Sequence, residues 1–266
     1  MKMNILVSNI NQSGPKDLTF KVRHKAYAAR YLQAFNKKSS MKNIFFVILF
    51  IILTVSCKEE KTNSIVVKEE NKFNQDLANE LEEIRQTDQF AADIARDEYE
   101  KLSKQEWKTI QDSLHLENQK RIKEISDQYG FVGYDLVGER GSQSFWLVVQ
   151  HADNNPEFQK KILEKMKIQV LNENADPVSF GLLTDRVKLN TGQKQIYGSQ
   201  VTYNWEICQA IPRDLADREN VNKRRSEIGL EPIEEYLNRM SEMHYKMNET
   251  IFKKNGLNGP TLYETE

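Results

Sequence analysis

Apolar positions recur three or four residues apart over long stretches of the chain, which is the period of an amphipathic helix. The first such stretch covers residues 73–101. Its leading apolar members are Phe73, Leu77, Leu81 and Ile84. A second helix is predicted for residues 103–129, because Ser103 and Glu106 have the spacing of a capping box and Gly130 follows as a stop.

Two further helix starts carry a capping side chain directly before a proline. Asn155 begins a helix that reaches about residue 172, and Asp176 begins one that reaches about residue 190. Ahead of both, the glycines of residues 131–141 predict a loop. Residues 144–152 are strongly apolar and predict a buried helix that ends at a polar turn.

The pattern changes after residue 192. Residues 194–203 and 205–211 are rich in β-branched and aromatic residues and predict the two strands of a hairpin. Helical spacing then returns over residues 217–228 and 232–254, with Gly229 as the stop between them.

These elements predict a mainly α fold, a helical domain with one inserted β-hairpin. The domain is expected to cover residues 73–256, with the hairpin near 193–211, and a polar tail follows at 257–266. Scarce glycine and proline, 11 and 6 residues in a chain of 266, agree with a helical architecture.

An uninterrupted apolar run, residues 44–55, follows the basic start Met41-Lys42-Asn43. As a helix it would reach about 18 Å, whereas the hydrocarbon core of a bilayer measures about 30 Å. The run is therefore too short to span and has the length of the apolar part of a secretory signal. The five residues that close it, Leu53-Thr54-Val55-Ser56-Cys57, resemble the lipobox of bacterial lipoproteins.

The resemblance implies that residues 41–56 are a signal peptide and that Cys57 becomes the first mature residue and carries the lipid. Residues 57–72 then form the acylated start and a polar, flexible linker. This places the protein in the cell envelope, lipid-anchored at the periplasmic or surface face of an outer membrane. Residues 1–40 are interpreted as a misassigned upstream extension. An uncleaved membrane anchor with a chance cysteine stays open as the alternative.

Charge is unevenly distributed along the chain. Nine Lys and Arg and one Asp give residues 1–56 a net charge of +8, which leaves −9 for the remainder of a chain whose total is −1. An acidic body repels phosphate groups, so nucleic acid is not expected as a partner. With Cys57 acylated, Cys208 has no disulfide partner, and its neighbours Ile207 and Ile211 indicate a buried, structural thiol.

Polar clusters mark the middle of the chain. They are the loop Gly133…Gly138-Glu139, Gln150-His151-Ala152-Asp153, Asp185-Arg186, Gln195-x-Tyr197-Gly198-x-Gln200 and the later Gly229-Leu230-Glu231-Pro232. In this order they make residues 81–230 resemble an uncharacterised bacterial domain family. No activity is established for that family, so the resemblance implies a domain and leaves its function open.

These clusters provide the candidate site. His151 is the expected general acid or base, Asp185 is its expected orienting carboxylate, and Arg186 would hold an anionic group. Four further side chains, Gln150, Gln195, Tyr197 and Gln200, are expected to recognise a polar ligand. The alternative is a hydrogen-bond network that only fixes the hairpin to the helices.

Three functions follow from this set of residues. The first is a binding or interaction lipoprotein with a polar pocket for a small ligand or an envelope protein. The second is a hydrolase-type enzyme that uses His151 and Asp185, and the third is a purely structural envelope protein. No metal-ligand spacing and no phosphate-binding glycine loop occurs in the sequence, so no metal or cofactor is predicted.

Overall fold

The computed structural model describes residues 73–265. The helices are α2 (Gln75–Ala92), α3 (Lys104–Tyr129), α4 (Tyr134–Gln150), α5 (Pro156–Leu171), α6 (Pro177–Asn190), α7 (Val221–Glu227), α8 (Ile233–Met247) and α9 (Glu249–Lys254), with the short 3-10 segments η1 (Asp97–Lys101) and η2 (Arg218–Asn220). None of these helices combines the length and the apolar character needed to cross a membrane. The interpretations of residues 1–40, 41–56 and 57–72, Cys57 included, lie outside the described part.

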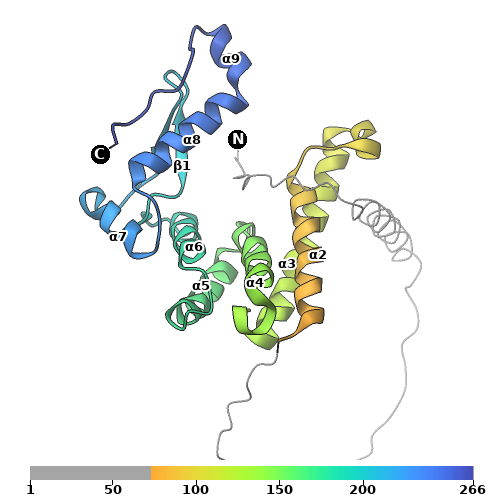
Figure 1. Ribbon diagram of the computed structural model, residues 1–266. Coiled ribbons are helices and arrows are strands. Elements are labelled where there is room, and N and C mark those ends of the chain that lie inside the picture. Colours follow the sequence, from red (N-terminus) through yellow and green to blue (C-terminus); the bar gives the residue numbers. More distant parts are fainter. Residues whose placement is uncertain (1–72, 266) are drawn as a thin grey trace, which may run out of the picture. The chain divides into compact units, whose positions relative to one another are not determined.

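The two strands, β1 (Val201–Asn204) and β2 (Gln209–Pro212), form an antiparallel hairpin in which Val201 lies opposite Pro212. This confirms the predicted fold class, a mainly α domain with one inserted hairpin. Figure 1 shows the hairpin alongside α8.

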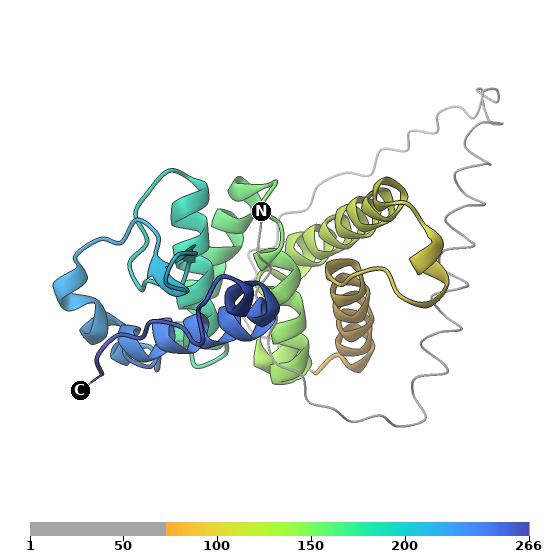
Figure 2. The ribbon, with the colours of Figure 1, turned by 90° about the horizontal axis from the view of Figure 1, so that it is seen from above.

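One hydrophobic core joins α2 to α6. α2 packs against both α3 and α4, and α5 packs against α6. Figure 2 shows α2 and α3 as neighbours, with the connection through η1 at one end of the pair. Phe145, Leu81 and Leu183, from three different helices, are fully buried in this core. A second core forms where α8 packs on β2, and it includes Ala210 and Leu237.

The local capping signals place the helix starts where the sequence indicated. Ser103 and Glu106 form the capping box of α3, and Gly130 ends that helix with a φ of +80°. The side chain of Asn155 accepts a hydrogen bond from the amide of Phe158, and Asp176 caps α6 in the same way. These contacts join residues at most three apart, which is why the sequence alone reveals them.

Other boundaries differ from the predictions. The first helix ends at Ala92 rather than near residue 101, and the expected loop 131–141 belongs mostly to α4. Gly138 interrupts α4 with a φ of +72°, a conformation that glycine adopts without strain. The expected helix over 232–254 is broken at Asn248 into α8 and α9.

The largest correction concerns the first predicted strand. Residues 194–200 have strand-like composition, yet only Val201–Asn204 pair with β2. The preceding segment folds as a loop whose backbone amides donate hydrogen bonds to Asp185. Gly198 adopts a φ of +73° in this loop, and an added Cβ would lie 2.5 Å from Cδ1 of Ile233. A regular strand is impossible at a residue with that backbone conformation.

Candidate functional site

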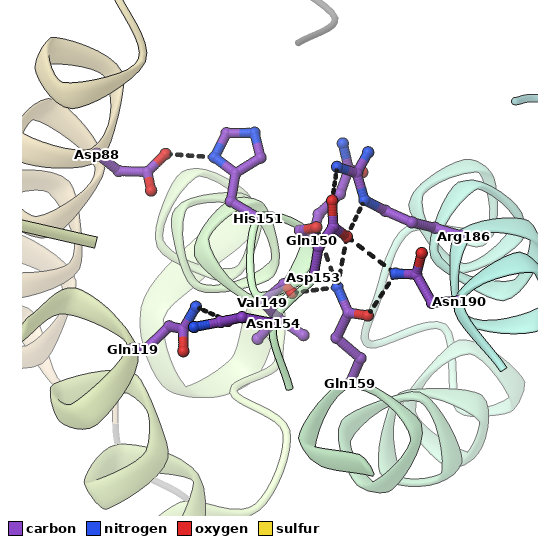
Figure 3. A network of polar contacts seen from close by, with 10 residues as sticks. All are labelled: Asp88, Gln119, Val149, Gln150, His151, Asp153, Asn154, Gln159, Arg186 and Asn190. Carbon is purple, nitrogen blue, oxygen red and sulfur yellow. Dashed lines mark hydrogen bonds and ion pairs between the residues drawn. The ribbon is translucent and has the colours of Figure 1, made fainter. Parts of the chain in front are cut away.

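A carboxylate lies on the buried face of α2. Asp88 is 1% exposed and occupies the same helical stripe as the core residues Ile84 and Ala91. Its Oδ2 lies 2.6 Å from Nδ1 of His151, which caps the C-terminal end of α4. Figure 3 shows this contact between the two helices. Asp88 therefore fixes the imidazole through Nδ1 and leaves Nε2 as the nitrogen that can contact a ligand.

A second histidine approaches the same carboxylate. Nδ1 of His115, on α3, lies 3.4 Å from Oδ1 of Asp88, which is an ion-pair distance. This oxygen is buried and receives no hydrogen bond from any residue that the structure describes. Burial by itself would raise the pKa of Asp88, but the contacts with His115 and His151 outweigh it and lower the pKa to about 2. Asp88 is therefore ionised at neutral pH.

The second half of the site is an ion pair between the turn that follows α4 and helix α6. Nε and Nη2 of Arg186 donate to the two carboxylate oxygens of Asp153, each at 2.7 Å. Such paired bonds fix the plane of the guanidinium. Asn190 donates to the same carboxylate at 2.9 Å. Nη1 of Arg186 makes no hydrogen bond with a described residue, and the Arg186 side chain is 14% exposed.

Gln159 joins the two parts of this network. It is fully buried, and its Nε2 donates to the main-chain oxygens of Val149 and Gln150 at 3.1 Å each. Its Oε1 accepts from Asn190 at 3.1 Å. The last turn of α4 thus has its carbonyl groups satisfied by a side chain of α5, which holds His151 and Asp153 at a fixed end of the helix (Figure 3).

Asp185 does not orient His151. It is fully buried, and its Oδ1 accepts hydrogen bonds from the amides of Ile196 at 2.8 Å and Tyr197 at 3.0 Å. Its Oδ2 accepts from the amide of Ser199 at 2.8 Å. The carboxylate therefore organises the loop before β1. The expected pairing was wrong because any donor can satisfy a buried carboxylate, and here the donors are backbone amides.

Gln195 holds the same loop. Its side chain is fully buried, donates to the main-chain oxygens of Gln200 and Arg213 at 2.8 and 2.7 Å, and accepts from the amide of Gln200 at 2.9 Å. The Gln200 side chain donates to Oγ of Ser199 at 3.3 Å. The polar atoms of Gln195 are thus used within the loop rather than presented to a ligand.

Tyr197 is half-buried, and burial raises the pKa of its hydroxyl, with a further contribution from Asp185. Its main-chain oxygen accepts from Nη1 of Arg225 at 2.6 Å. Arg225 is fully buried, lies over the Tyr236 ring and also donates to the main-chain oxygen of Glu231 at 2.6 Å. The Gln-x-Tyr-Gly-x-Gln segment is accordingly a loop fixed from both sides.

The expected site residues therefore fall into two groups. One group, Gln150, His151 and Arg186, lies at the C-terminal end of α4. The other group, Asp185, Gln195, Tyr197 and Gln200, builds the loop before β1. The structure brings the first group together with Asp88 and His115, which the sequence pattern did not single out.

A signal for both missed residues exists in the sequence. Asp88 continues the spacing of the apolar stripe of α2, at an interval where a core residue is expected. His115 lies three and seven residues before the buried Asn118 and Ile122, on the same face of α3. A charged residue on an apolar stripe needs a partner from another element. The apolar stripe therefore indicates that Asp88 and His115 require polar partners, but it does not identify those partners.

Among residues 73–265 no group of three His, Cys, Asp or Glu side chains has the arrangement of a metal site. Cys208 is fully buried, and burial raises its pKa, so the thiol lacks the environment of a reactive cysteine. Its Sγ lies 3.8 Å from the main-chain oxygen of Ser241.

Fold and site together define a helical domain with a small hairpin, in which a buried carboxylate holds a histidine at the end of a helix. The chain belongs to DUF6624, a family of unknown function, whose characteristic sequence matches residues 75–248. This confirms that the body of the chain is an uncharacterised domain. No curated protein and no solved structure matches the chain.

Proposed function

We propose that this protein is a lipid-anchored lipoprotein of the cell envelope whose domain binds a small polar ligand at the C-terminal end of α4. The ligand contacts the partly exposed side chains of His151 and Arg186. Residues 41–56 act as the signal peptide, and Cys57 carries the lipid.

One observation carries the ligand-binding proposal: a polar atom at this site stays unsatisfied beside a well-packed core. Oε1 of Gln150 is buried and receives no hydrogen bond from a described residue. Leaving such a group unpaired costs about 1–3 kcal/mol. A network kept only for stability would satisfy this atom or replace Gln150 with an apolar side chain. Residues retained at a cost to stability are typical of functional sites.

The reachable atoms indicate the chemistry of the ligand. Because Nδ1 of His151 is hydrogen-bonded to Asp88, Nε2 is the nitrogen that can accept a hydrogen bond from an O–H or N–H group of a ligand. Nη1 of Arg186 donates to an oxygen. The two carboxylates, Asp88 and Asp153, outnumber the single guanidinium of Arg186, which disfavours a strongly anionic ligand. A compound rich in hydroxyl or amide groups, such as a saccharide, meets these requirements.

The test is a titration of the purified full chain in detergent with glucose and N-acetylglucosamine. The ¹⁵N signals of the His151 imidazole are followed by NMR, and His244 serves as the internal control because it is buried in the other core. We expect a saturable shift at His151 and none at His244. His151→Gln, which retains an amide donor for Asp88, should abolish binding, whereas Asn154→Ala on the adjoining turn should bind normally. Equal shifts at both histidines, or none at either, would contradict the proposal.

The anchor is tested separately. Cells that express the chain are fed labelled palmitate, and the protein is then isolated. The label is expected on the wild-type chain in the membrane fraction and absent from Cys57→Ser. Label that persists in the variant, or a wild-type chain that takes up none, would contradict the lipoprotein assignment while leaving the ligand site untouched.

The contact between Asp88 and His151 also supports a second function, that of an acid–base enzyme. A carboxylate on Nδ1 stabilises the charged imidazole that forms when Nε2 takes up a proton. In this reading Asp88 has the role first assigned to Asp185. A screen with ester, amide and glycoside substrates tests it. Turnover that disappears in His151→Gln and survives in Asn154→Ala would favour the enzyme over the binding protein.

A further inference from the structure

A cavity of about 280 Å³ opens between α4, α5 and the start of α6. Its lining comprises Phe131, Tyr134, Glu139, Ser142, Gln143, Trp146, Met166, Asp176 and Ser179. None of these residues belongs to the site around His151, which lies at the other end of α4. The volume is close to the lower limit for small-molecule sites, about 300 Å³, so the cavity suits a ligand of few atoms.

The floor of this cavity is apolar and rigid. Phe131, Trp146 and Met166 are all buried members of the first core. Nε1 of Trp146 donates to the main-chain oxygen of Ser179 at 2.9 Å, which fixes the orientation of the indole. Two aromatic rings and a thioether thus form a surface that can contact an alkyl group or a cation.

The rim carries negative charge. Glu139 and Asp176 are its charged residues, and neither Lys nor Arg lines the cavity. Burial raises the pKa of Tyr134, and the charges of Asp176 and Glu139 raise it further, which shows that both carboxylates act on this space. Asp176 is already used as the cap of α6. Glu139 makes no ion pair or hydrogen bond with a described residue, so its charge is available to a ligand.

One buried polar group points to a ligand independently of the charges. Ser142 is 3% exposed and lines the cavity, and its hydroxyl has no hydrogen-bond partner among the described residues. Serine hydroxyls inside helices ordinarily donate to a carbonyl of the preceding turn, as Ser144 does in the same helix. The hydroxyl of Ser142 is therefore available to a molecule in the cavity.

We propose that this cavity binds a small organic cation, an amine or a quaternary ammonium compound that carries a hydroxyl group. The cationic head lies against Trp146 and near Glu139, and its hydroxyl pairs with Ser142. A negative rim over an aromatic floor is the arrangement that recognises such cations. No Lys or Arg lines the cavity, so no basic side chain in the lining competes with a cationic ligand for Glu139 and Asp176.

Choline and its neutral isostere 3,3-dimethyl-1-butanol test the proposal, because the two differ in charge and hardly in shape. Isothermal titration of the full chain in detergent gives the affinity of each. We expect choline to bind at least about fivefold more tightly, the effect of an exposed cation–π contact with a nearby carboxylate. Equal affinity for both compounds, or no binding of choline, would overturn the proposal.

Variants locate the binding within the cavity. Glu139→Gln should weaken the binding of choline by about three- to tenfold and leave the affinity for 3,3-dimethyl-1-butanol unchanged. Because Glu139 is exposed, the variant is expected to fold. Glu164→Gln, an exposed residue of α5 outside the lining, is the matched control. Unaltered choline binding in Glu139→Gln would refute the assignment. His151→Gln should bind choline normally, which separates this inference from the proposed function.

Discussion

Replacing Asp88 with Asn removes the charge between His115 and His151 while keeping the size of the side chain. The pKa of Asp88 lies at about 2 in the folded protein, against an ordinary value of 3.8. Each pKa unit corresponds to about 1.4 kcal/mol. The ionised carboxylate therefore contributes about 2 kcal/mol to the free energy of unfolding near neutral pH, and Asp88→Asn is expected to lose that amount.

The sign of the pH dependence follows from the lowered pKa. A carboxylate whose pKa is depressed by folding stabilises the protein above its unfolded pKa, and this stability is lost as the pH falls through the folded pKa. The difference in stability between wild type and Asp88→Asn should accordingly fall to about 1 kcal/mol near pH 3 and almost vanish near pH 2.

Urea denaturation followed by circular dichroism, repeated between about pH 7 and pH 3, gives the free energy of unfolding of both proteins. Asp112→Asn on the exposed face of α3 is the control, since its ion pair with Lys108 is exposed and contributes little. A difference that does not change with pH would refute the electrostatic account of Asp88. So would a variant as stable as the wild type at pH 7.

Two further predictions concern residues away from this contact. Asp185→Asn should destabilise the protein by about 2–3 kcal/mol, because the new amide cannot accept hydrogen bonds from all three backbone donors of the loop. Amide hydrogen exchange should accelerate at Ile196, Tyr197 and Ser199. Unchanged exchange at these residues would contradict the role of Asp185. In a Cys57→Ser background, Cys208 should react with a thiol reagent at least about 100-fold more slowly in the folded protein than in urea, as buried groups require local opening. Similar rates in both states would show that the thiol is accessible.

The helix starts were predictable because each depends on a few consecutive residues. Asn155 and Asp176 accept hydrogen bonds from amides two or three residues further on, and no distant residue is needed. The hairpin was only partly predictable. Its presence follows from composition, but residues 205–208, predicted as strand, form the turn before β2. Residues 195–200 leave the strand conformation because a carboxylate on α6 accepts hydrogen bonds from amides of this segment.

The sequence by itself determined the helical class, the main helix N-caps and the burial of Cys208, because periodicity and capping act over one or two turns. It also showed that His151 is a polar residue at the end of an apolar helix. Only the tertiary structure decided which carboxylate contacts it. Asp88 and Asp185 both lie on buried helix faces, and both need a polar partner. Because α2 packs on α4, Asp88 is the carboxylate that contacts His151. Partner choice between buried groups depends on distances across helices, and no local pattern encodes those distances.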